Sequence, residues 1–249
     1  MDALKLKITD YWSRRASAFA GQRLRELSSE KRALWLAEFD RYLPKGRKLD
    51  ILDIGTGAGF FAFLLASEGH RVTGIDLTEE MVREAEKTAL SLNLDVNFAV
   101  MDAETPDFMP ESFDAIVTRN LTWTLPRLEN AYGAWYELLK PGGVMMNFDA
   151  DYCRQVAEAV ETELPENHAH QDIPSAMIAE NDEITLELSA YQQPRPQWDV
   201  GLLLSAGFER IVTDAGVWRR VYRERDEFYN PVPIFTIAAY KRDYGKEGR

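Results

Sequence analysis

Cysteine is nearly absent from this sequence of 249 residues, where Cys153 stands alone. A single cysteine excludes an intrachain disulfide framework and a metal site built from several cysteines. Long apolar runs are also missing, since the run over residues 60–66 is far shorter than the roughly 20 residues that span a bilayer. Residues 1–12 contain no apolar stretch typical of a secretory signal. We therefore expect a cytoplasmic protein without a membrane partner.

Positive charge is scarce as well. The 29 lysines and arginines are outnumbered by 41 aspartates and glutamates, which gives a formal net charge of −12 at pH 7. A protein with this excess of negative charge repels phosphate backbones, so nucleic acid is not expected as a partner. The hydrophobic share of 45% and the charged share of 28% are ordinary for a globular chain. A chain of this length buries a sizeable core.

Strand-like and helix-like segments alternate in the first half of the chain. Five short apolar runs have the length of strands, and three stretches between them have helical periodicity. The expected strands cover residues 49–54, 71–76, 96–101, 113–118 and 144–148, and the expected helices cover residues 60–68, 78–92 and 127–139. Strict alternation of this kind predicts an α/β fold with a parallel sheet covered by helices on both faces.

The flanking segments follow other patterns. Residues 8–43 have the periodicity of two helices. A further helix is expected at residues 197–206, and two late strands at 208–214 and 234–241 are close enough in sequence to pair antiparallel. We expect one domain over residues 1–249. Its parts are an N-terminal helical cap (1–44), a ligand-binding core (45–150), a proline-rich and acidic insert (151–196) and a C-terminal helix with strands (197–249).

A glycine-rich loop follows the first expected strand, in the segment LDIGTGAGF at residues 52–60. Glycine allows a positive φ and a close approach of a ligand to the backbone. Such a loop lies at the carboxyl end of a strand, where ligands bind in open α/β sheets. The dinucleotide pattern needs a third glycine at the position that Phe60 occupies, and Gly59 comes one residue early. The loop therefore suits a nucleoside without phosphates better than a dinucleotide.

Two acidic residues end the next strands. Asp76 ends the second expected strand, where a carboxylate accepts hydrogen bonds from ribose hydroxyls. Asp102 ends the third, where a carboxylate can accept a hydrogen bond from an adenine amino group. A glycine loop alone can be a tight turn and nothing more. Because strand, glycines, helix and two acids occur in this order, we favour a nucleoside ligand.

These segments resemble the motifs of the class I S-adenosylmethionine (SAM)-dependent methyltransferase family. The resembling stretches are LDIGTGAGF (52–60), GIDLTEEM (74–81), MDAE (101–104), FDAIVTRN (113–120) and PGG (141–143). The resemblance is close over residues 45–150 and looser up to residue 241. It implies a Rossmann-like, doubly wound, seven-stranded sheet whose last strand is antiparallel. It also implies SAM as cofactor and methyl transfer to a small-molecule acceptor.

The resemblance assigns residues to SAM. The glycine loop would surround the methionine part, Asp53 would hold its amino group and Asp76 the ribose. Asn120 would lie beside the reacting methyl group, and an aromatic pair on the N-terminal helix would cover the cofactor. The full set is Tyr11, Trp12, Arg15, Asp53, Gly55, Thr56, Gly57, Gly59, Asp76, Leu77, Met81, Asp102, Ala103 and Asn120. Methyl transfer needs mainly alignment and exclusion of water, so no catalytic residue is assigned.

The acceptor side is less well defined. Trp123, in the loop after the fourth strand, is the candidate for lining an acceptor pocket, whereas Tyr132 and Trp135 have the helical spacing of core residues. Three further candidates for the acceptor follow the fifth strand, and they are Asp149, Asp151 and Tyr152. The two aspartates are interpreted either as a base or anchor for a cationic substrate, or as helix-capping acids in a solvated loop.

Several alternatives remain open at this level. DNA methyltransferases that act on amino groups usually carry an Asn/Asp-Pro-Pro-aromatic motif, and this chain has RNLTW at residues 119–123 instead. His168 and His170 are expected at the surface, without a metal, because a metal needs three or four convergent ligands. An NAD(P)-dependent oxidoreductase and a non-catalytic SAM-binding protein are the competing interpretations. A homodimer is compatible with the sequence, which does not itself indicate an oligomeric state.

Overall fold

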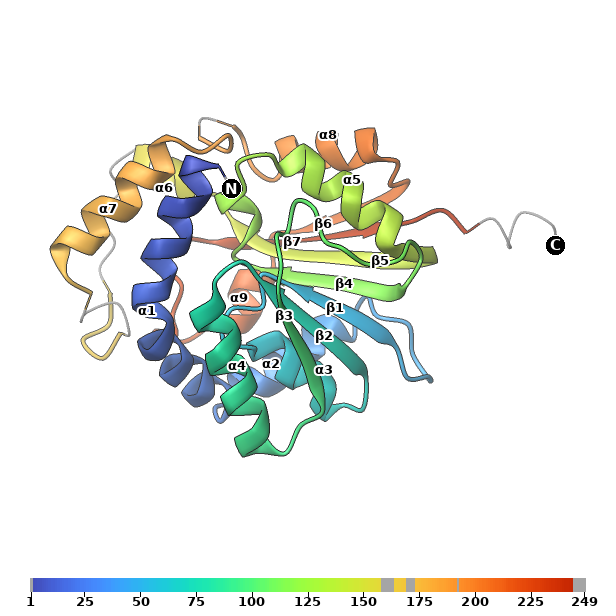
Figure 1. Ribbon diagram of the computed structural model, residues 1–249, viewed down its shortest axis with the longest axis horizontal. Helices are drawn as coiled ribbons and strands as arrows, with labels where there is room; N and C mark the ends of the chain where they lie inside the picture. Colours follow the sequence, from blue (N-terminus) through green and yellow to red (C-terminus); the bar gives the residue numbers. More distant parts are fainter. Residues whose placement is uncertain (1, 158–163, 169–172, 192, 244–249) are drawn as a thin grey trace.

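The computed structural model describes residues 2–157, 164–168, 173–191 and 193–243 (Figure 1). The strands are β1 (Asp50–Ile54), β2 (Arg71–Asp76), β3 (Val96–Val100), β4 (Phe113–Arg119), β5 (Leu139–Ala150), β6 (Arg210–Asp214) and β7 (Ile234–Tyr240). The helices are α1 (Ala3–Leu27), α2 (Lys31–Phe39), α3 (Phe60–Ser67), α4 (Glu79–Leu92), α5 (Leu128–Leu138), α6 (Tyr152–Ala157), α7 (Ser175–Leu186), α8 (Gln197–Ala206) and α9 (Val217–Val221), with a 3₁₀ turn η1 (Thr122–Thr124).

The strands form one seven-stranded sheet in the order β3-β2-β1-β4-β5-β7-β6. The neighbours from β3 to β5 are parallel, and β7 runs antiparallel to both β5 and β6. This topology confirms the predicted doubly wound α/β fold with an antiparallel last strand. The strand order reverses between β1 and β4, and ligands bind at the carboxyl ends of strands at such a reversal.

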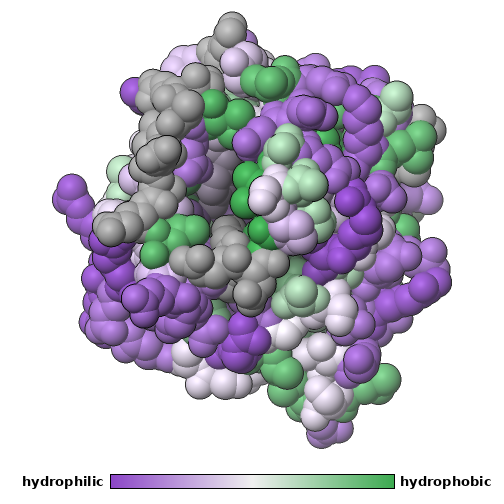
Figure 2. Space-filling view, turned by 90° about the vertical axis from the view of Figure 1, so that its left-hand side faces the viewer, coloured by the Kyte–Doolittle hydropathy of each residue, from purple (hydrophilic) through white to green (hydrophobic). Residues whose placement is uncertain are grey.

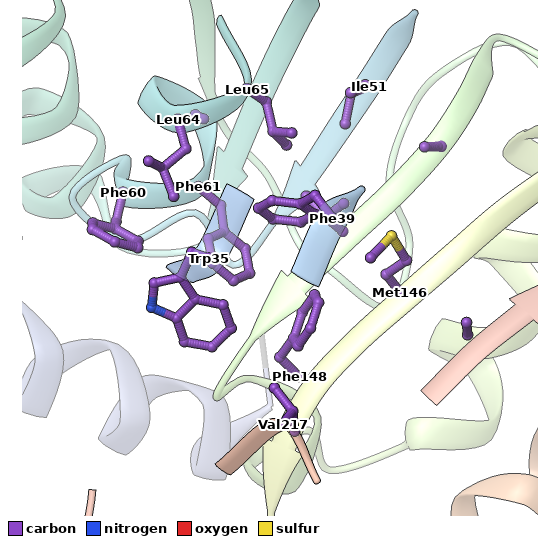
Figure 3. Close-up of a cluster of buried hydrophobic side chains, with 14 of the residues drawn as sticks. Trp35, Phe39, Ile51, Phe60, Phe61, Leu64, Leu65, Met146, Phe148 and Val217 are labelled. Atoms are coloured by element: carbon purple, nitrogen blue, oxygen red, sulfur yellow. The ribbon is translucent and has the colours of Figure 1, made fainter. Parts of the chain in front are cut away.

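Two hydrophobic layers cover the sheet. Helices α2, α3 and α9 pack on one face, and α5 and α8 pack on the other (Figure 1). Figure 3 shows Trp35 and Phe39 of α2 and Phe61 of α3 converging on Phe148 of β5. The ring centroids of these three residues lie 5.3, 5.6 and 5.5 Å from that of Phe148, in edge-to-face arrangements. This aromatic cluster fixes the N-terminal helices to the sheet.

Some element boundaries differ from the prediction. Helix α1 begins at Ala3, five residues before the expected start, and its N-cap Asp2 accepts a hydrogen bond from the amide of Leu4. The 141–143 turn belongs to β5, where a register shift opposite β4 accommodates it. Helix α9 was not predicted. No helix in the described ranges is long and apolar enough to cross a membrane.

The segment between β5 and α8 contains α6 and α7, and α7 lies beside α1 (Figure 1). Lys7 of α1 forms an ion pair of 2.6 Å with Glu187, which follows α7. Arg14 of α1 also pairs with Glu180 of α7. Because these pairs are partly exposed, they orient the two helices more than they stabilise them.

Phe148 provides a test of the aromatic cluster. Replacing Phe148, which is fully buried, with alanine should lower the free energy of unfolding by about 3–5 kcal/mol, because it removes apolar contacts and leaves a cavity. Leu90→Ala, at an exposed leucine, should leave stability nearly unchanged. Urea denaturation of the two variants measures the difference. Equal stability of the two variants would contradict this account of the core.

Candidate active site

The glycine loop connects β1 to α3 with backbone that only glycine adopts easily. Gly55, Gly57 and Gly59 have φ values of +66°, +52° and +89°. A Cβ atom at Gly55 would also lie 2.7 Å from the side chain of Leu121, which is closer than real Cβ contacts. The loop therefore presents bare backbone at the carboxyl end of β1.

The side chain of Asp53 stabilises this loop through hydrogen bonds. Its Oδ2 accepts hydrogen bonds from the Thr56 hydroxyl at 2.6 Å and the Ala62 amide at 3.1 Å. The carboxyl group is almost completely buried, and this burial raises the pKa of Asp53 to about 7. A cation bound beside Asp53 would favour the carboxylate and lower that pKa again.

Asp76 holds the loop from the end of β2. Its Oδ2 accepts a hydrogen bond from the Gly57 amide and its Oδ1 accepts one from the Thr78 amide, both at 2.9 Å. Partial removal from water raises the pKa of Asp76. Because each carboxylate oxygen has further lone pairs, Asp76 can also accept hydrogen bonds from a ligand.

A cavity of about 590 Å³ opens above this loop. Its walls come from the glycine loop, α1, the end of β4, α6, α7 and residues 222–232. Figure 2 shows a hollow with hydrophobic side chains at its edge on the side of the molecule where α1 and α7 lie. A smaller pocket of about 60 Å³ adjoins it and shares Gly55, Asp76, Leu121 and Thr124. The large cavity has the volume of a typical small-molecule site.

The structure brings most of the predicted site residues together. Those that line the large cavity are Tyr11, Trp12, Asp53, Gly55, Thr56, Gly57, Asp76, Met81, Asn120, Trp123 and Tyr152. Leu77, Asp102 and Ala103 line the smaller pocket. Arg15, Gly59, Asp149 and Asp151 line neither of them. Tyr132 and Trp135 are fully buried in the core, as predicted.

Helix α1 covers the cavity with aromatic rings. Tyr11 and Trp12 meet edge to face with centroids 5.4 Å apart. Arg15 donates a hydrogen bond to the Tyr11 hydroxyl at 3.1 Å, and its guanidinium carbon lies 5.3 Å from the Trp12 ring centroid. Arg15 therefore contacts both rings of this aromatic pair, and its contact with the ligand stays a prediction.

Two polar contacts attach α1 to the site. Ser13 donates a hydrogen bond of 2.7 Å to Glu80 of α4. Lys5 is buried and lies 2.6 Å from Asp102 and 2.5 Å from Glu104. One oxygen of the Asp102 carboxylate is thus already paired with an ammonium group from α1.

The structure does not place Asp149 at the cavity, because its side chain is fully buried and lines neither pocket. Its Oδ2 accepts hydrogen bonds from the Thr122 hydroxyl and, at 2.9 Å, from the Trp123 amide. Arg195, also fully buried, lies 3.1 Å from Asp149 and 2.6 Å from Asp199. Asp149 therefore fixes η1 and the segment before α8 to the end of β5.

The structure also shows the surroundings of Asp151, which had two interpretations, and of His168, which was expected at the surface. Asp151 accepts a hydrogen bond of 3.2 Å from the Arg154 amide at the start of α6, which fits the helix-capping interpretation. His168 is buried, not at the surface, with Nε2 2.7 Å from the Tyr229 carbonyl oxygen. His170 lies outside the described residues. Within those residues, no group of three His, Cys, Asp or Glu side chains is placed to hold a metal.

Other lining residues were not predicted. They include Phe19, Gln22 and Arg23 of α1, Arg119 of β4, and Tyr222 and Tyr229 near the C-terminus. Arg119 directly precedes Asn120 in FDAIVTRN, so its strand-end position was a usable signal. The others come from segments whose approach to the site depends on the tertiary fold.

Comparisons with known proteins agree with this geometry. Residues 51–143 match a family described as a methyltransferase domain. The ubiquinone/menaquinone biosynthesis C-methyltransferase UbiE of Rickettsia peacockii is 31% identical over 190 residues, which are 72% of this chain and 75% of that protein. The ubiquinone biosynthesis O-methyltransferase of Pseudomonas entomophila is 33% identical over 113 residues. That match covers 45% of this chain and 47% of the relative, so it spans about half of the relative's length.

Solved structures show the same fold. Phosphoethanolamine N-methyltransferase 2 of Haemonchus contortus, in complex with phosphomonomethylethanolamine and S-adenosylhomocysteine, has a TM-score of 0.58 and 21% identity. The match covers 84% of this chain and 52% of that one. The fold and the loop are those of a Rossmann-like methyltransferase domain. This chain belongs to the class I SAM-dependent methyltransferase family.

The residues present fit SAM. The cavity is large enough for an adenosyl amino acid, and the pocket beside Asp76 adds room at the end of β2 and β3. Aromatic faces such as those of Tyr11 and Trp12 suit a positive sulfonium. Phe60, which lines the cavity where the dinucleotide pattern has glycine, does not suit a pyrophosphate.

Arg195 allows a test of the buried network around Asp149. Arg195→Met should lower the free energy of unfolding by about 3–5 kcal/mol, because Asp149 and Asp199 would lose their common cation. Arg83→Met removes the exposed pair with Glu79 and should change stability little. Urea denaturation compares the two variants. An Arg195 variant as stable as the Arg83 variant would show that the network does not stabilise the fold.

Proposed function

We propose that this chain transfers the methyl group of SAM to a small-molecule acceptor. The observation that supports this most is the single cavity that joins the glycine loop and Asp76 to aromatic residues such as Trp123 and Tyr152. Bound SAM would supply a methyl group that is already activated by the sulfonium. The acceptor atom would attack the methyl carbon in line with the breaking carbon–sulfur bond. The chain would contribute alignment and exclusion of water.

We assign each part of the cofactor to residues that line the two pockets. Asp76 would accept hydrogen bonds from the ribose, and Asp53 would face the methionine ammonium group. Leu77 and Ala103 would contact adenine in the smaller pocket, where Asp102 lies at the edge. Tyr11 and Trp12 would cover the cofactor from α1. Their placement around two pockets that share Gly55 and Asp76 supports these assignments.

The aromatic lining of the cavity favours an acceptor with an apolar or aromatic body. Trp123, Tyr152, Phe228 and Tyr229 all line the cavity. Aromatic rings pack well against a body of this kind. Between the acceptor types in the names of the relatives, we favour the quinone-biosynthesis type over phosphoethanolamine.

The direct test is calorimetry with S-adenosylhomocysteine and NADH, followed by incubation with SAM and candidate acceptors. S-adenosylhomocysteine should bind and NADH should not. A hydroxylated aromatic acceptor should be methylated, with stoichiometric release of S-adenosylhomocysteine detected by mass spectrometry. Binding of NADH alone would support the oxidoreductase interpretation, and cofactor binding without turnover on any acceptor would support the non-catalytic one.

Asp76 provides the sharpest mutational test of the cofactor assignment. Asp76→Ala should weaken binding of S-adenosylhomocysteine by about 1–3 kcal/mol, because a charged hydrogen-bond acceptor for the ribose is lost. Asp95→Ala changes an exposed aspartate outside both pockets and should leave affinity unchanged. Isothermal titration of both variants gives the comparison. Full affinity in the Asp76 variant would remove it from the site.

The raised pKa of Asp53 predicts that the affinity for the cofactor depends on pH. Its pKa is raised to about 7 by burial, and a bound ammonium group would lower it. Above pH 7 the carboxylate is already ionised, so binding needs no proton release. Below pH 7 a proton must leave, and affinity should fall by up to about tenfold per pH unit. Titrations of S-adenosylhomocysteine between about pH 5.5 and 8.5, in steps of roughly one pH unit, measure this slope, and Asp53→Asn should flatten it.

A further inference from the structure

Asn120 lies between the glycine loop and the aromatic residues of the cavity. It directly follows β4, and a Cβ atom on Gly55 would lie 2.7 Å from the side chain of the next residue, Leu121. The carbonyl oxygen of Asn120 accepts a hydrogen bond of 3.1 Å from the Trp123 indole. Asn120 itself lines the cavity. It therefore borders both the part of the cavity that is assigned to the cofactor and the part that is lined by aromatic rings.

The backbone of Asn120 is held in one conformation. Its amide donates a hydrogen bond of 2.9 Å to the carbonyl oxygen of Phe148 in β5. Its φ is +54°, in the left-handed region. This conformation is uncommon for residues other than glycine, and asparagine adopts it more readily than most. Backbone of this kind is concentrated at functional sites, where the surrounding structure enforces it.

Two hydrogen bonds connect the side chain of Asn120 to the segment before β7. The Oδ1 atom of Asn120 accepts a hydrogen bond of 3.0 Å from the Tyr152 hydroxyl. That hydroxyl accepts a hydrogen bond of 2.6 Å from Nδ2 of Asn230. The Oδ1 atom of Asn230 accepts one of 3.1 Å from the backbone amide of Val232. We call Asn230, Tyr152 and Asn120 the amide relay.

The donors and acceptors of the amide relay are set by Val232. A backbone amide can only donate, so Asn230 must turn its oxygen to Val232 and its nitrogen to Tyr152. The Tyr152 hydroxyl then has its own hydrogen left to donate, and the oxygen of Asn120 accepts it. Burial raises the pKa of Tyr152, so the phenol keeps this hydrogen at neutral pH. The side-chain nitrogen of Asn120 is therefore the end of the amide that faces away from Tyr152.

This nitrogen is a donor that the protein leaves unused. Within the ranges that the structure describes, Nδ2 of Asn120 forms no hydrogen bond with another residue. It is not enclosed either, so it is open to the cavity that Asn120 lines. A donor that is partly removed from water favours a ligand atom that accepts a hydrogen bond.

We propose that Asn120 selects the methyl acceptor by donating a hydrogen bond from its amide nitrogen to a deprotonated oxygen of that molecule. Tyr152 and Asn230 are positioning residues, because they act on the acceptor only through the orientation of the Asn120 amide. This inference rests on the proposed function, since it assumes that the acceptor enters the same cavity as SAM. The class of acceptor is a phenol that reacts as its phenolate, in place of an amine.

The lone pairs of the acceptor decide between these two classes. A neutral amine needs its one lone pair for the methyl carbon, so it can offer Asn120 only N–H groups. A phenolate oxygen has further lone pairs, so it can attack the methyl carbon and accept from Asn120 together. The rings of Trp123 and Tyr152, with centroids 5.2 Å apart, also line the cavity and suit the ring of a phenol.

The methyl transfer on such an acceptor is balanced without a further reactant. The phenol would lose its proton to solvent before it enters the cavity. A lone pair of the oxygen would form the bond to the methyl carbon, and the electron pair of the breaking carbon–sulfur bond would return to sulfur. Asn120 would hold the oxygen throughout and take no proton.

The test uses two probes of the same shape, pentafluorophenol and pentafluoroaniline. The first is ionised at neutral pH and offers an accepting oxygen, whereas the second is uncharged and offers N–H groups. Fluorine NMR titration measures the affinity of each for the chain saturated with S-adenosylhomocysteine. The wild-type complex should bind the phenolate roughly tenfold more tightly, the scale of one hydrogen bond to a charged group.

Tyr152→Phe removes the amide relay and keeps the aromatic ring. The Asn120 amide would then be free to turn, so the preference for the phenolate should fall several-fold while the affinity for S-adenosylhomocysteine stays unchanged. Tyr191→Phe is the matched control, because Tyr191 lines neither pocket, and it should keep the wild-type preference. An unchanged preference in a folded Tyr152 variant would overturn the inference.

Asn230→Asp reverses the amide relay. An aspartate accepts from both Val232 and Tyr152, so Asn120 would have to donate to Tyr152 and turn its oxygen to the cavity. The affinity for the uncharged pentafluoroaniline should therefore rise severalfold. Asn181→Asp, at another residue that lines the cavity, adds the same charge outside the relay and should not raise that affinity. Thermal melting checks that each variant is folded, and either relay variant alone decides the result.

The remaining outcomes separate this inference from the proposed function. If the wild-type chain binds S-adenosylhomocysteine but prefers pentafluoroaniline, or binds neither probe, the inference is overturned and the proposed function stands. An affinity for pentafluoroaniline that rises equally in the Asn230 and Asn181 variants would also overturn it, because charge alone would explain the change. If the wild-type chain binds no S-adenosylhomocysteine, the proposed function fails and the inference fails with it.

Discussion

The reversal of strand order between β1 and β4 is the constraint on which the site depends. It leaves the carboxyl ends of these strands without a crossing helix, and the glycine loop after β1 fills that position with bare backbone. Two acids keep the loop in place, Asp53 through Thr56 and Ala62 and Asp76 through Gly57. A side chain at Gly55 would collide with Leu121. Because both residues line the cavity, the contact that sets the loop geometry also shapes the cavity.

Helix α1, which covers the cavity, is attached to the rest of the fold by buried ion pairs as well as by packing. At one end of α1, Lys5 is paired with Asp102 and Glu104, and at the other end Glu26 is paired with Arg119. Both contacts join α1 to strand ends of the sheet or to the loops that follow them. Buried ion pairs add little net stability but fix relative positions, because the wrong arrangement leaves a charge unpaired. We infer that these pairs fix the position of Tyr11 and Trp12 over the cavity.

Features encoded locally could be predicted from the sequence. The glycine loop, Asp76 and Asp102 each follow an apolar strand directly, and strand ends meet at one edge of a parallel sheet. Asp149 has the same kind of position, but the structure buries it because Arg195, 46 residues later, pairs with it. Arg23 has no local signal, because its contribution depends on where α1 crosses β4. Long-range partners thus decide where Asp149 lies and which residues outside the motifs line the cavity.

The central claim is that the loop after β1 holds the adenosyl amino acid of SAM. The most direct measurement is a crystal structure of the chain grown with S-adenosylhomocysteine. The account predicts density for the ligand along Gly55, Gly57 and Asp76, with the ribose at Asp76. Ligand density at another place, or an undisturbed loop without ligand at saturating concentration, would contradict it.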